Sequence, residues 1–170
     1  MDGFEGFREF VAAHTAAWSR LAYVLTGGHA AAEDLMQAAL LKTVRRWRTI
    51  CRYEQPEAYV RRVMYHEAVS QWRRRRVVVE LPVASVPDTS APYDADEHVR
   101  RIEVRRALAR LTPHQRAVLV LRFYEDRSVV ETADILGCSV GTVKSQTAYA
   151  LGRLRALTPH LAGLLTEEAI

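Results

Sequence analysis

Apolar and aromatic residues recur at alternating steps of three and four along the first part of the chain. The pattern runs through Phe4, Phe7, Val11, His14, Trp18, Leu21 and Leu25. This is the spacing of one face of a helix. Gly27 and Gly28 follow it, and glycine is a common residue at helix ends. The sequence therefore predicts a long amphipathic first helix that ends at this glycine pair.

Two further helices are predicted before residue 77. The first runs from about residue 30 to 48, with Glu33 and Asp34 in its first turn, where the helix dipole favours acids. Its apolar side comprises Leu35, Met36, Ala39, Leu40, Val44 and Trp47. The pattern breaks over residues 49–55. Pro56 then opens the next helix, since proline is tolerated in a first turn, and that helix reaches the arginine run at 73–76.

Residues 77–96 differ from both flanks, with Pro82, Pro87 and Pro92 separated by serine, threonine and aspartate. Such a composition is typical of an extended, flexible tether. We therefore expect two small domains, residues 1–76 and 97–170, joined by a flexible linker at 77–96.

Helical patterns return after the linker, at about 97–110 and 114–124. Thr112, followed by Pro113 and then Gln115, is a helix-capping signature. Alternation with a period of two is confined to residues 77–79, which is too short to predict a strand. The expected fold class is all-α.

Residues 129–145 have the pattern of a helix-turn-helix. The apolar side of its first helix comprises Ala133, Ile135 and Leu136. Gly137 can adopt the positive φ that ends a helix, and Ser139 is placed to cap the next one.

The second helix of this motif has two contrasting faces. Its apolar stripe comprises Val143, Thr147, Ala150, Leu151, Leu154 and Leu157. Its other face comprises Gly141, Lys144, Ser145, Ala148, Gly152 and Arg155, with Tyr149 at the flank. A small, hydrogen-bonding and cationic face suits close approach to the major groove of DNA. From this segment alone, a helical hairpin within a bundle remains the alternative.

Charge is unevenly spread along the chain, whose net charge is +4. Residues 1–76 hold 13 basic and 8 acidic side chains, residues 77–96 hold 4 acids and no base, and residues 97–170 hold 11 bases and 8 acids. All the basic residues except Lys42 and Lys144 are arginine. Arginine-rich blocks favour a polyanion such as nucleic acid, or a charged membrane surface.

Cationic and aromatic residues are interleaved on and after the third predicted helix. They include Tyr59, Arg61, Arg62, Tyr65, His66, Gln71, Trp72 and the arginines at 73–76. Arginines follow a phosphate backbone while aromatic rings stack on unpaired bases, so the mixture suits single-stranded DNA. For Tyr59 and Trp72 individually, a place in the core is the favoured interpretation. The 49–55 loop, with Arg52 and Tyr53, is a candidate pocket for an extruded base.

Several function classes are disfavoured by what the sequence lacks. Cys51 and Cys138 have no CxxC partner, and the six histidines show no metal-ligand spacing. His66-Glu67 lacks the second histidine of a zinc protease, and there is no glycine-rich phosphate loop. No secretory leader or run of 18 apolar residues is present. We therefore expect no metal, no cofactor, no enzymatic activity, no membrane span and a cytoplasmic location.

Four segments, in order along nearly the whole chain, resemble the bacterial extracytoplasmic-function sigma factors. They are AEDLMQAALLK at 32–42, residues 56–76 beginning PEAY, ALARLTPHQRAVL at 107–119 and GTVKS at 141–145. The resemblance implies an initiation factor that binds core RNA polymerase and directs it to promoter DNA. An anti-sigma protein is a further candidate partner.

The resemblance also implies roles for individual residues. Asp34 and Gln37 would face the polymerase clamp. The region-2-like domain would open the proximal promoter element, with candidate contacts at Arg52, Tyr53, Arg61, Arg62, Tyr65, His66, Arg73 and Arg74. The region-4-like domain would bind the polymerase flap and read the distal element, with candidate contacts at Ser139, Thr142, Lys144, Ser145, Ala148 and Tyr149.

The chain departs from the family pattern at three positions. Gln146 follows Lys-Ser where the family commonly has arginine, and His66 and Ser70 stand where asparagine and aspartate are common. These departures concern the promoter sequence rather than polymerase docking.

A second hypothesis is a free-standing regulator whose N-terminal helices sense a ligand or dimerise. It expects tight binding of the isolated protein to a palindromic duplex.

Overall fold

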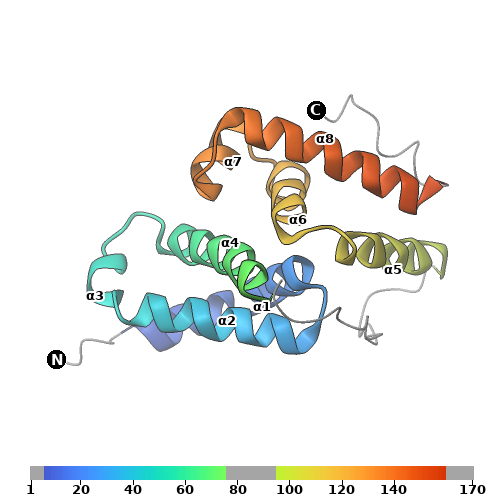
Figure 1. Ribbon diagram of the computed structural model, residues 1–170. Helices are drawn as coiled ribbons and strands as arrows, with labels where there is room; N and C mark the ends of the chain where they lie inside the picture. Colours follow the sequence, from blue (N-terminus) through green and yellow to red (C-terminus); the bar gives the residue numbers. More distant parts are fainter. Residues whose placement is uncertain (1–5, 76–94, 160–170) are drawn as a thin grey trace. The chain divides into compact units, whose positions relative to one another are not determined.

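The computed structural model describes residues 6–75 and 95–159, with side chains described for 6–70 and 102–159. Within these ranges every regular element is a helix, which confirms the all-α class (Figure 1). Backbone contacts divide the chain into two compact units, Met1–Val78 and Val79–Ile170. Residues 76–94, which include all but the last two residues of the expected linker at 77–96, lie outside the described residues.

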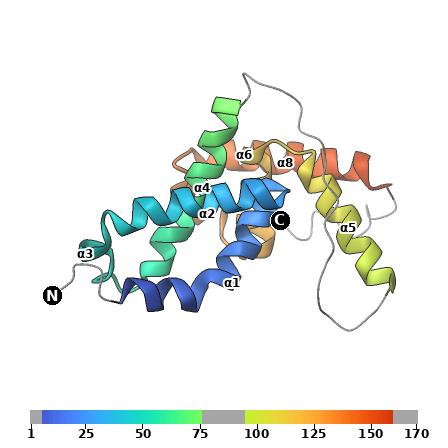
Figure 2. The same ribbon diagram turned by 90° about the horizontal axis from the view of Figure 1, so that it is seen from below.

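The first unit contains α1 (Phe7–Thr26), α2 (His29–Val44), the short α3 (Trp47–Ile50) and α4 (Pro56–Arg75). Helix α2 packs against both α1 and α4, and α1 also contacts α4. Figure 2 shows that α4 crosses α2 instead of running alongside it. The largest fully buried side chains of this unit come from four helices and are Trp18, Leu25, Leu35, Ile50, Val60, Met64 and Tyr65.

Helix α1 ends as the glycine pair predicts. Gly27 has a φ of 79°, and its N–H donates to the carbonyl of Tyr23 at 2.8 Å. This left-handed conformation favours glycine because a Cβ would be strained there. The buried stripe of α1 lies in its second half, and Phe4 falls outside the described residues.

The second predicted helix is interrupted, contrary to the expectation of one helix over 30–48. Helix α2 stops at Val44, and α3 carries Trp47, which is 5% exposed. The Trp47 ring lies 5.1 Å from that of Phe7 and 4.8 Å from that of Phe10, measured between centroids. The break between α2 and α3 therefore comes just before Trp47, whose ring is buried against α1. The expectation of acids in the first turn is also wrong, because α2 begins at His29 and this turn contains none.

The second unit contains α5 (Ala95–Ala109), α6 (Pro113–Leu119), η1 (Val120–Tyr124), α7 (Val129–Leu136) and α8 (Val140–Leu157). Helix α8 packs on α5, α6 and α7. One cluster in its core comprises Ala107, Leu111, Leu119, Ala150, Leu151 and Leu154. A second comprises Val118, Ala133 and Val143, with Val129, Leu136 and Cys138 packed against it.

Side-chain hydrogen bonds from Thr112, Gln115 and Arg116 stabilise the junction between α5 and α6. The Thr112 capping box is confirmed: its side chain accepts from the N–H of Gln115 at 3.3 Å, and its own N–H donates to the Gln115 side chain at 3.2 Å. Arg116 is 4% exposed and donates to the carbonyls of Leu108, Ala109 and Leu111 at 2.8, 2.9 and 3.3 Å. Burial lowers the pKa of Arg116 to about 10, which still leaves the side chain charged at neutral pH. A buried cation therefore satisfies carbonyls at and just beyond the end of α5.

The helix predicted over 114–124 changes type within its length. After Leu119 it continues as a π-helix, in which the N–H of Glu125 donates to the carbonyl of Val120 at 2.9 Å. Within this segment Phe123 and Tyr124 are 39% and 64% exposed. Such segments are rare and are often found at functional sites.

Candidate polymerase and nucleic-acid interface

The turn between α7 and α8 has the geometry of a helix-turn-helix. Gly137 has a φ of 65°, and the N–H of Cys138 donates to the carbonyl of Ala133 at 3.0 Å, which closes the end of α7. Ser139 then caps α8, because its hydroxyl accepts from the N–H of Thr142 at 3.1 Å. Both predicted turn residues are therefore confirmed in their structural roles.

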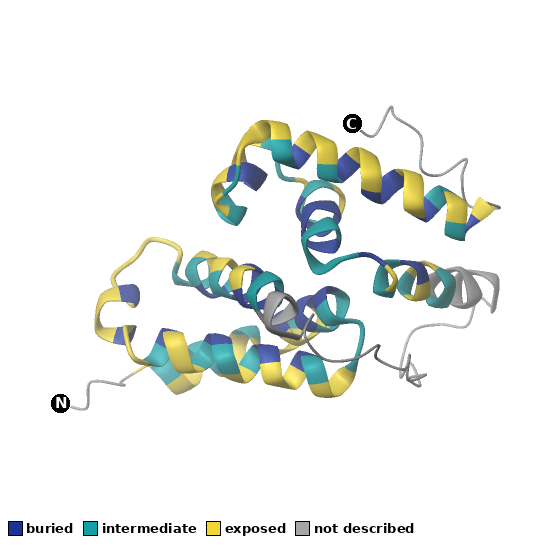
Figure 3. Ribbon diagram, viewed as in Figure 1, coloured by how far each residue is buried: buried dark blue, intermediate teal, exposed yellow. Residues whose placement is uncertain are grey.

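The two faces of α8 also match the sequence pattern (Figure 3). Val143, Thr147, Ala150, Leu151 and Leu154 are buried, and Leu157 is half-buried. The other face exposes Gly141, Lys144, Ser145, Ala148 and Gly152, while Arg155 is half-buried. The Tyr149 ring is 70% exposed. One face of α8 is thus packed in the core, and the other presents mainly small residues together with Lys144, with Tyr149 at its flank.

Helix α7 differs in detail from the expectation. Ala133 is buried and Leu136 packs on the same cluster, but Ile135 is only half-buried. The buried polar residue of α7 is Thr132, which is 0% exposed. The reason is helical phase: Val129, Thr132, Ala133 and Leu136 form one stripe, and Ile135 lies to its side.

Ser128 and Glu131 form a second capping box, at the start of α7, which was not predicted. The hydroxyl of Ser128 accepts from the N–H of Glu131 at 3.1 Å, and the N–H of Ser128 donates to the Glu131 carboxylate at 2.8 Å. The Ser-x-x-Glu spacing before an apolar stretch was the available signal. These bonds from Ser128 hold the pKa of Glu131 below its usual value.

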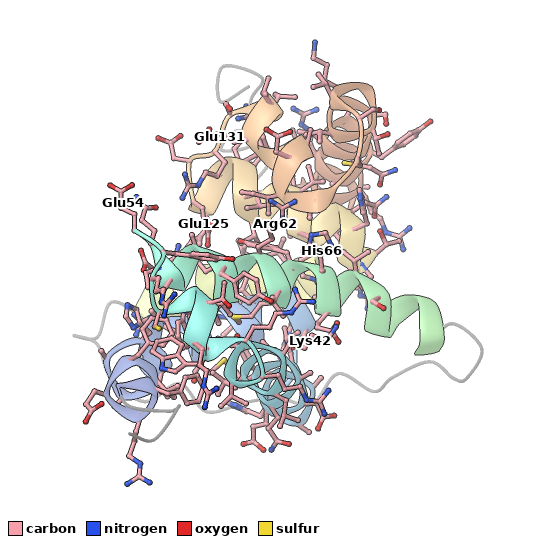
Figure 4. The ribbon with its side chains drawn as sticks, turned by 90° about the vertical axis from the view of Figure 1, so that its left-hand side faces the viewer. Lys42, Glu54, Arg62, His66, Glu125 and Glu131 are labelled. Atoms are coloured by element: carbon pink, nitrogen blue, oxygen red, sulfur yellow. The ribbon has the colours of Figure 1, made fainter. Side chains whose placement is uncertain are left out.

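Helix α4 and the loop before it contain the proximal-element candidates. Arg62 and His66 are exposed, Arg61 is half-buried, and Figure 4 shows Arg62 and His66 on the side of α4 away from Lys42. In the loop, Arg52 is exposed and Tyr53 is 48% exposed. The side chains of Arg73 and Arg74 lie outside the described residues.

Tyr65 does not belong to this exposed surface. Its side chain is 1% exposed and packs in the core of the first unit. Tyr65 and its neighbour Met64 are both on the buried side of α4. In this conformation the Tyr65 ring is therefore covered by protein and cannot stack on a base. The assignment of Tyr65 to DNA contact is therefore corrected.

Tyr53 is held in place by a neighbour on α4. Its ring centroid lies 6.3 Å from that of the half-buried Tyr59, and the two ring planes meet at 65°, an edge-on arrangement. Such a contact between aromatic rings is favourable. The Tyr53 ring is thus partly exposed to solvent and packs against Tyr59 on one edge.

The polymerase-facing candidates lie on α2. Asp34 and Gln37 are both exposed. They share a stripe with Leu41, because residues 34, 37 and 41 follow helical spacing. Leu41 is 58% exposed, and the sequence reasoning missed it. This stripe of α2 therefore exposes an acid, an amide and an apolar side chain together.

The described residues contain no group of three or more histidine, cysteine, aspartate or glutamate side chains placed to hold a metal. Burial raises the pKa of the Cys138 thiol, which packs at the edge of a core cluster. No helix in the described ranges is long and apolar enough to cross a bilayer.

Comparison with known proteins matches both units to one family. The model of Sigma-70 region 2 matches residues 10–77, and that of Sigma-70, region 4 matches residues 107–156. An RNA polymerase sigma-E factor of Streptomyces avermitilis is 40% identical over 149 residues, covering 88% of this chain and 83% of the relative. The ECF RNA polymerase sigma factor SigL of Mycobacterium tuberculosis is 33% identical over 152 residues, which cover 87% of this chain and 86% of SigL.

A solved structure is also similar. It is the sigma factor RpoE in complex with the anti-sigma factor NepR from Bartonella quintana. The TM-score is 0.67 at 26% identity, covering 90% of this chain and 96% of that one. The match of the first unit to region 2 does not favour the alternative of a ligand-sensing or dimerisation domain there. The chain belongs to the sigma-70 family as an extracytoplasmic-function sigma factor, an initiation factor that directs RNA polymerase to promoter DNA.

Proposed function

We propose a division of labour among the surfaces of this sigma factor. Asp34 and Gln37 on α2 bind the polymerase clamp. Arg52, Tyr53, Arg61, Arg62 and His66, continued by Arg73 and Arg74, open the proximal promoter element. Ser139, Thr142, Lys144, Ser145, Ala148 and Tyr149 read the distal one. The exposed face of α8, opposite a fully packed stripe, is the observation that carries this assignment.

The polymerase contact is supported by the composition of the α2 stripe. Asp34 places a negative charge on a domain whose net charge is positive, and an acid there repels DNA phosphates. Leu41 supplies apolar area that a protein partner can cover. A second polymerase contact, with the flap, fits the exposed Phe123, Tyr124 and Val130 at the start of the helix-turn-helix.

The proximal contact is supported by cations and an aromatic ring on neighbouring elements. The half-exposed ring of Tyr53 is available for stacking on an unpaired base, a contact worth about 1–3 kcal/mol per base. Arg62 and His66 lie one turn apart on the exposed side of α4 and can follow the strand. The departure at His66 would change which base is preferred and not where the strand runs.

The distal contact is supported by the caps and the small residues of α8. Ser139 and Thr142 lie at its N-terminus, where side-chain hydroxyls and backbone N–H groups suit phosphate contact. Lys144, Ser145, Ala148 and Tyr149 then face outward over the next two turns. Lys144 can donate hydrogen bonds to base edges or phosphates, and the Ser145 hydroxyl, which donates to the carbonyl of Thr142 at 3.0 Å, can accept one from a base. Ala148 and Tyr149 can contact a thymine methyl.

The remaining expectations are part of the same proposal. Residues 77–96 act as a flexible tether between domains at 1–76 and 97–170, which their proline-rich acidic composition supports. The protein works in the cytoplasm as a polymerase subunit and performs no catalysis itself. Because the similar Bartonella sigma factor was solved with an anti-sigma factor, a protein of that class is proposed as an inhibitory partner here.

The polymerase contact is tested by Asp34→Arg. We expect this full-length variant to lose binding to core polymerase at micromolar concentration while its circular dichroism and melting temperature stay those of the wild type. Glu9→Arg, which makes the same charge change at an exposed position of α1, serves as the control and should bind normally. Equal affinity of wild type and Asp34→Arg for the core enzyme would remove Asp34 from the contact.

A further inference from the structure

Helices α2 and α4 pack through buried side chains that are mainly apolar, yet an ion pair also joins them. The buried residues include Ala39 on α2 and Met64 and Ala68 on α4. Glu67 lies beside Ala68 and is 6% exposed. Lys42 of α2 donates a hydrogen bond to Oε1 of Glu67 and forms an ion pair with it. Burial of a carboxylate costs free energy even when it is paired, so the presence of Glu67 calls for a reason.

Stability alone is a poor reason for this pair. Apolar residues of similar volume are often as stabilising as a buried ion pair, or more so, because the ions must first be removed from water. An ion pair has a different advantage, since it can fix one register between two elements. Apolar packing is non-directional, and apolar cores lose a unique arrangement before they lose stability. The pair is therefore suited to fix the position of α4 on α2.

The position of α4 on α2 matters because the two helices have different roles in the proposed function. His66 directly precedes Glu67, and Figure 4 shows Arg62 and His66 on the side of α4 away from Lys42. On α2, Lys42 directly follows Leu41 of the stripe proposed to bind the polymerase. A helix moves as a rigid element over a few turns. A shift of Glu67 along α2 would therefore displace His66 relative to the polymerase.

We propose that the Lys42–Glu67 pair is a positioning element for promoter opening. It holds α4 in the register on α2 that places Arg62 and His66 against the strand of the proximal element. Glu67 itself is buried and acts through these exposed neighbours. The inference rests on the proposed polymerase contact of α2 and the proposed DNA contact of α4. It adds that the opening step depends on the ion pair that joins the two helices.

The test replaces both ions together, in the full-length variant Lys42→Met/Glu67→Leu. Neither charge is then left without the other. The matched control Arg20→Met/Glu9→Leu makes the same two replacements at exposed positions of α1. Circular dichroism gives the melting temperature of each variant. Binding assays give its affinity for core polymerase and, at a low temperature that keeps the duplex closed, the affinity of the holoenzyme for the promoter. The fluorescence of 2-aminopurine in the proximal element gives the rate of opening.

We expect Lys42→Met/Glu67→Leu to melt at or above the wild-type temperature and to bind core polymerase and the closed promoter normally. Its rate of opening should fall by about tenfold or more, since a displacement of about 1 Å can cost a working site about a hundredfold in rate. The control should open the promoter at the wild-type rate. Lys42→Arg keeps a cation within reach of Glu67 and should retain most of the rate.

Opening at the wild-type rate by the double variant would overturn the proposal, as would an equal loss in the control. Weaker binding to core polymerase would make the pair part of the polymerase contact instead. If the double variant does not fold, Lys42→Met decides the question at a temperature where it is fully folded, and opening at the wild-type rate there would also overturn the proposal. If the wild-type holoenzyme itself leaves the duplex closed, the proposed opening function fails together with this inference.

Discussion

Lys42 of α2 forms an ion pair with Glu67 of α4, and the two side chains differ sharply in exposure. The Lys42 side chain is 55% exposed, whereas that of Glu67 is only 8% exposed. Figure 4 shows Lys42 on the side of α4 opposite to Arg62 and His66. The pair therefore ties the helix proposed to bind polymerase to the rear of the helix proposed to bind DNA.

We expect Lys42→Met to lower the free energy of unfolding of the first domain by about 1–2 kcal/mol. The substitution leaves the nearly buried carboxylate without this cation, and the exposure of Lys42 keeps the cost below that of a fully buried pair. Tryptophan fluorescence during urea unfolding measures it, since Trp18, Trp47 and Trp72 all lie in the unit Met1–Val78. Arg20→Met should change little, and equal stability of Lys42→Met and wild type would contradict the account.

Arg116 should be among the most sensitive positions of the second domain. Replacement by methionine removes three hydrogen bonds to carbonyls at and beyond the end of α5 and should cost about 3 kcal/mol or more. Hydrogen exchange of the backbone amides of residues 102–109 should accelerate. Arg116→Lys retains the positive charge but not the planar set of guanidinium donors. We therefore expect it to restore only part of the stability that the methionine variant loses. Full stability of Arg116→Lys would mean that charge alone suffices.

Local patterns in the sequence predicted much of this fold because their causes are local. The cap at Thr112, the turn at Gly137 and Ser139 and the two faces of α8 each depend on residues within a few positions of one another. The break before Trp47 and the π-helix at Val120–Tyr124 were not predicted. The ring of Trp47 packs on side chains of another helix, which short-range periodicity does not register.

The same limit applies to the candidate site. Interleaved arginine and tyrosine suggested a DNA surface on α4, but burial decides which members belong to it, and it removes Tyr65 while leaving Arg62. Leu41 lies outside the apolar side predicted for its helix, and the sequence pattern gave it no role. Its exposure of 58%, next to the exposed Asp34 and Gln37, makes it a candidate contact residue.

Glu131 predicts a pH dependence of the second domain. Hydrogen bonds from Ser128 hold its pKa below the usual 4.5, so its contribution to stability is complete above that value and is lost as the pH falls through the lowered pKa. We expect Glu131→Gln to melt below the wild type at pH 7 and the difference to shrink in strong acid. Thermal melts followed by circular dichroism at both pH values check this. A difference that is constant with pH would contradict the role of the carboxylate.

Lys144 and Tyr149 should have separable effects on the distal element. We expect Lys144→Gln to weaken holoenzyme binding to duplex promoters broadly, and Tyr149→Ala to cost about 1–3 kcal/mol and relax the preference at one base pair. Competition binding with single-base variants of the distal element distinguishes the two. Arg106→Gln, at an exposed position of α5, is the control. Unchanged binding in both variants would move the reading surface away from α8.

The most direct test of the whole account is to sequence the 5′ ends of transcripts made by core polymerase supplied with this chain. We expect defined start sites that share two upstream motifs, and we expect them to be lost with Asp34→Arg but not with Glu9→Arg. Start sites no more specific than those of the core enzyme alone would contradict it.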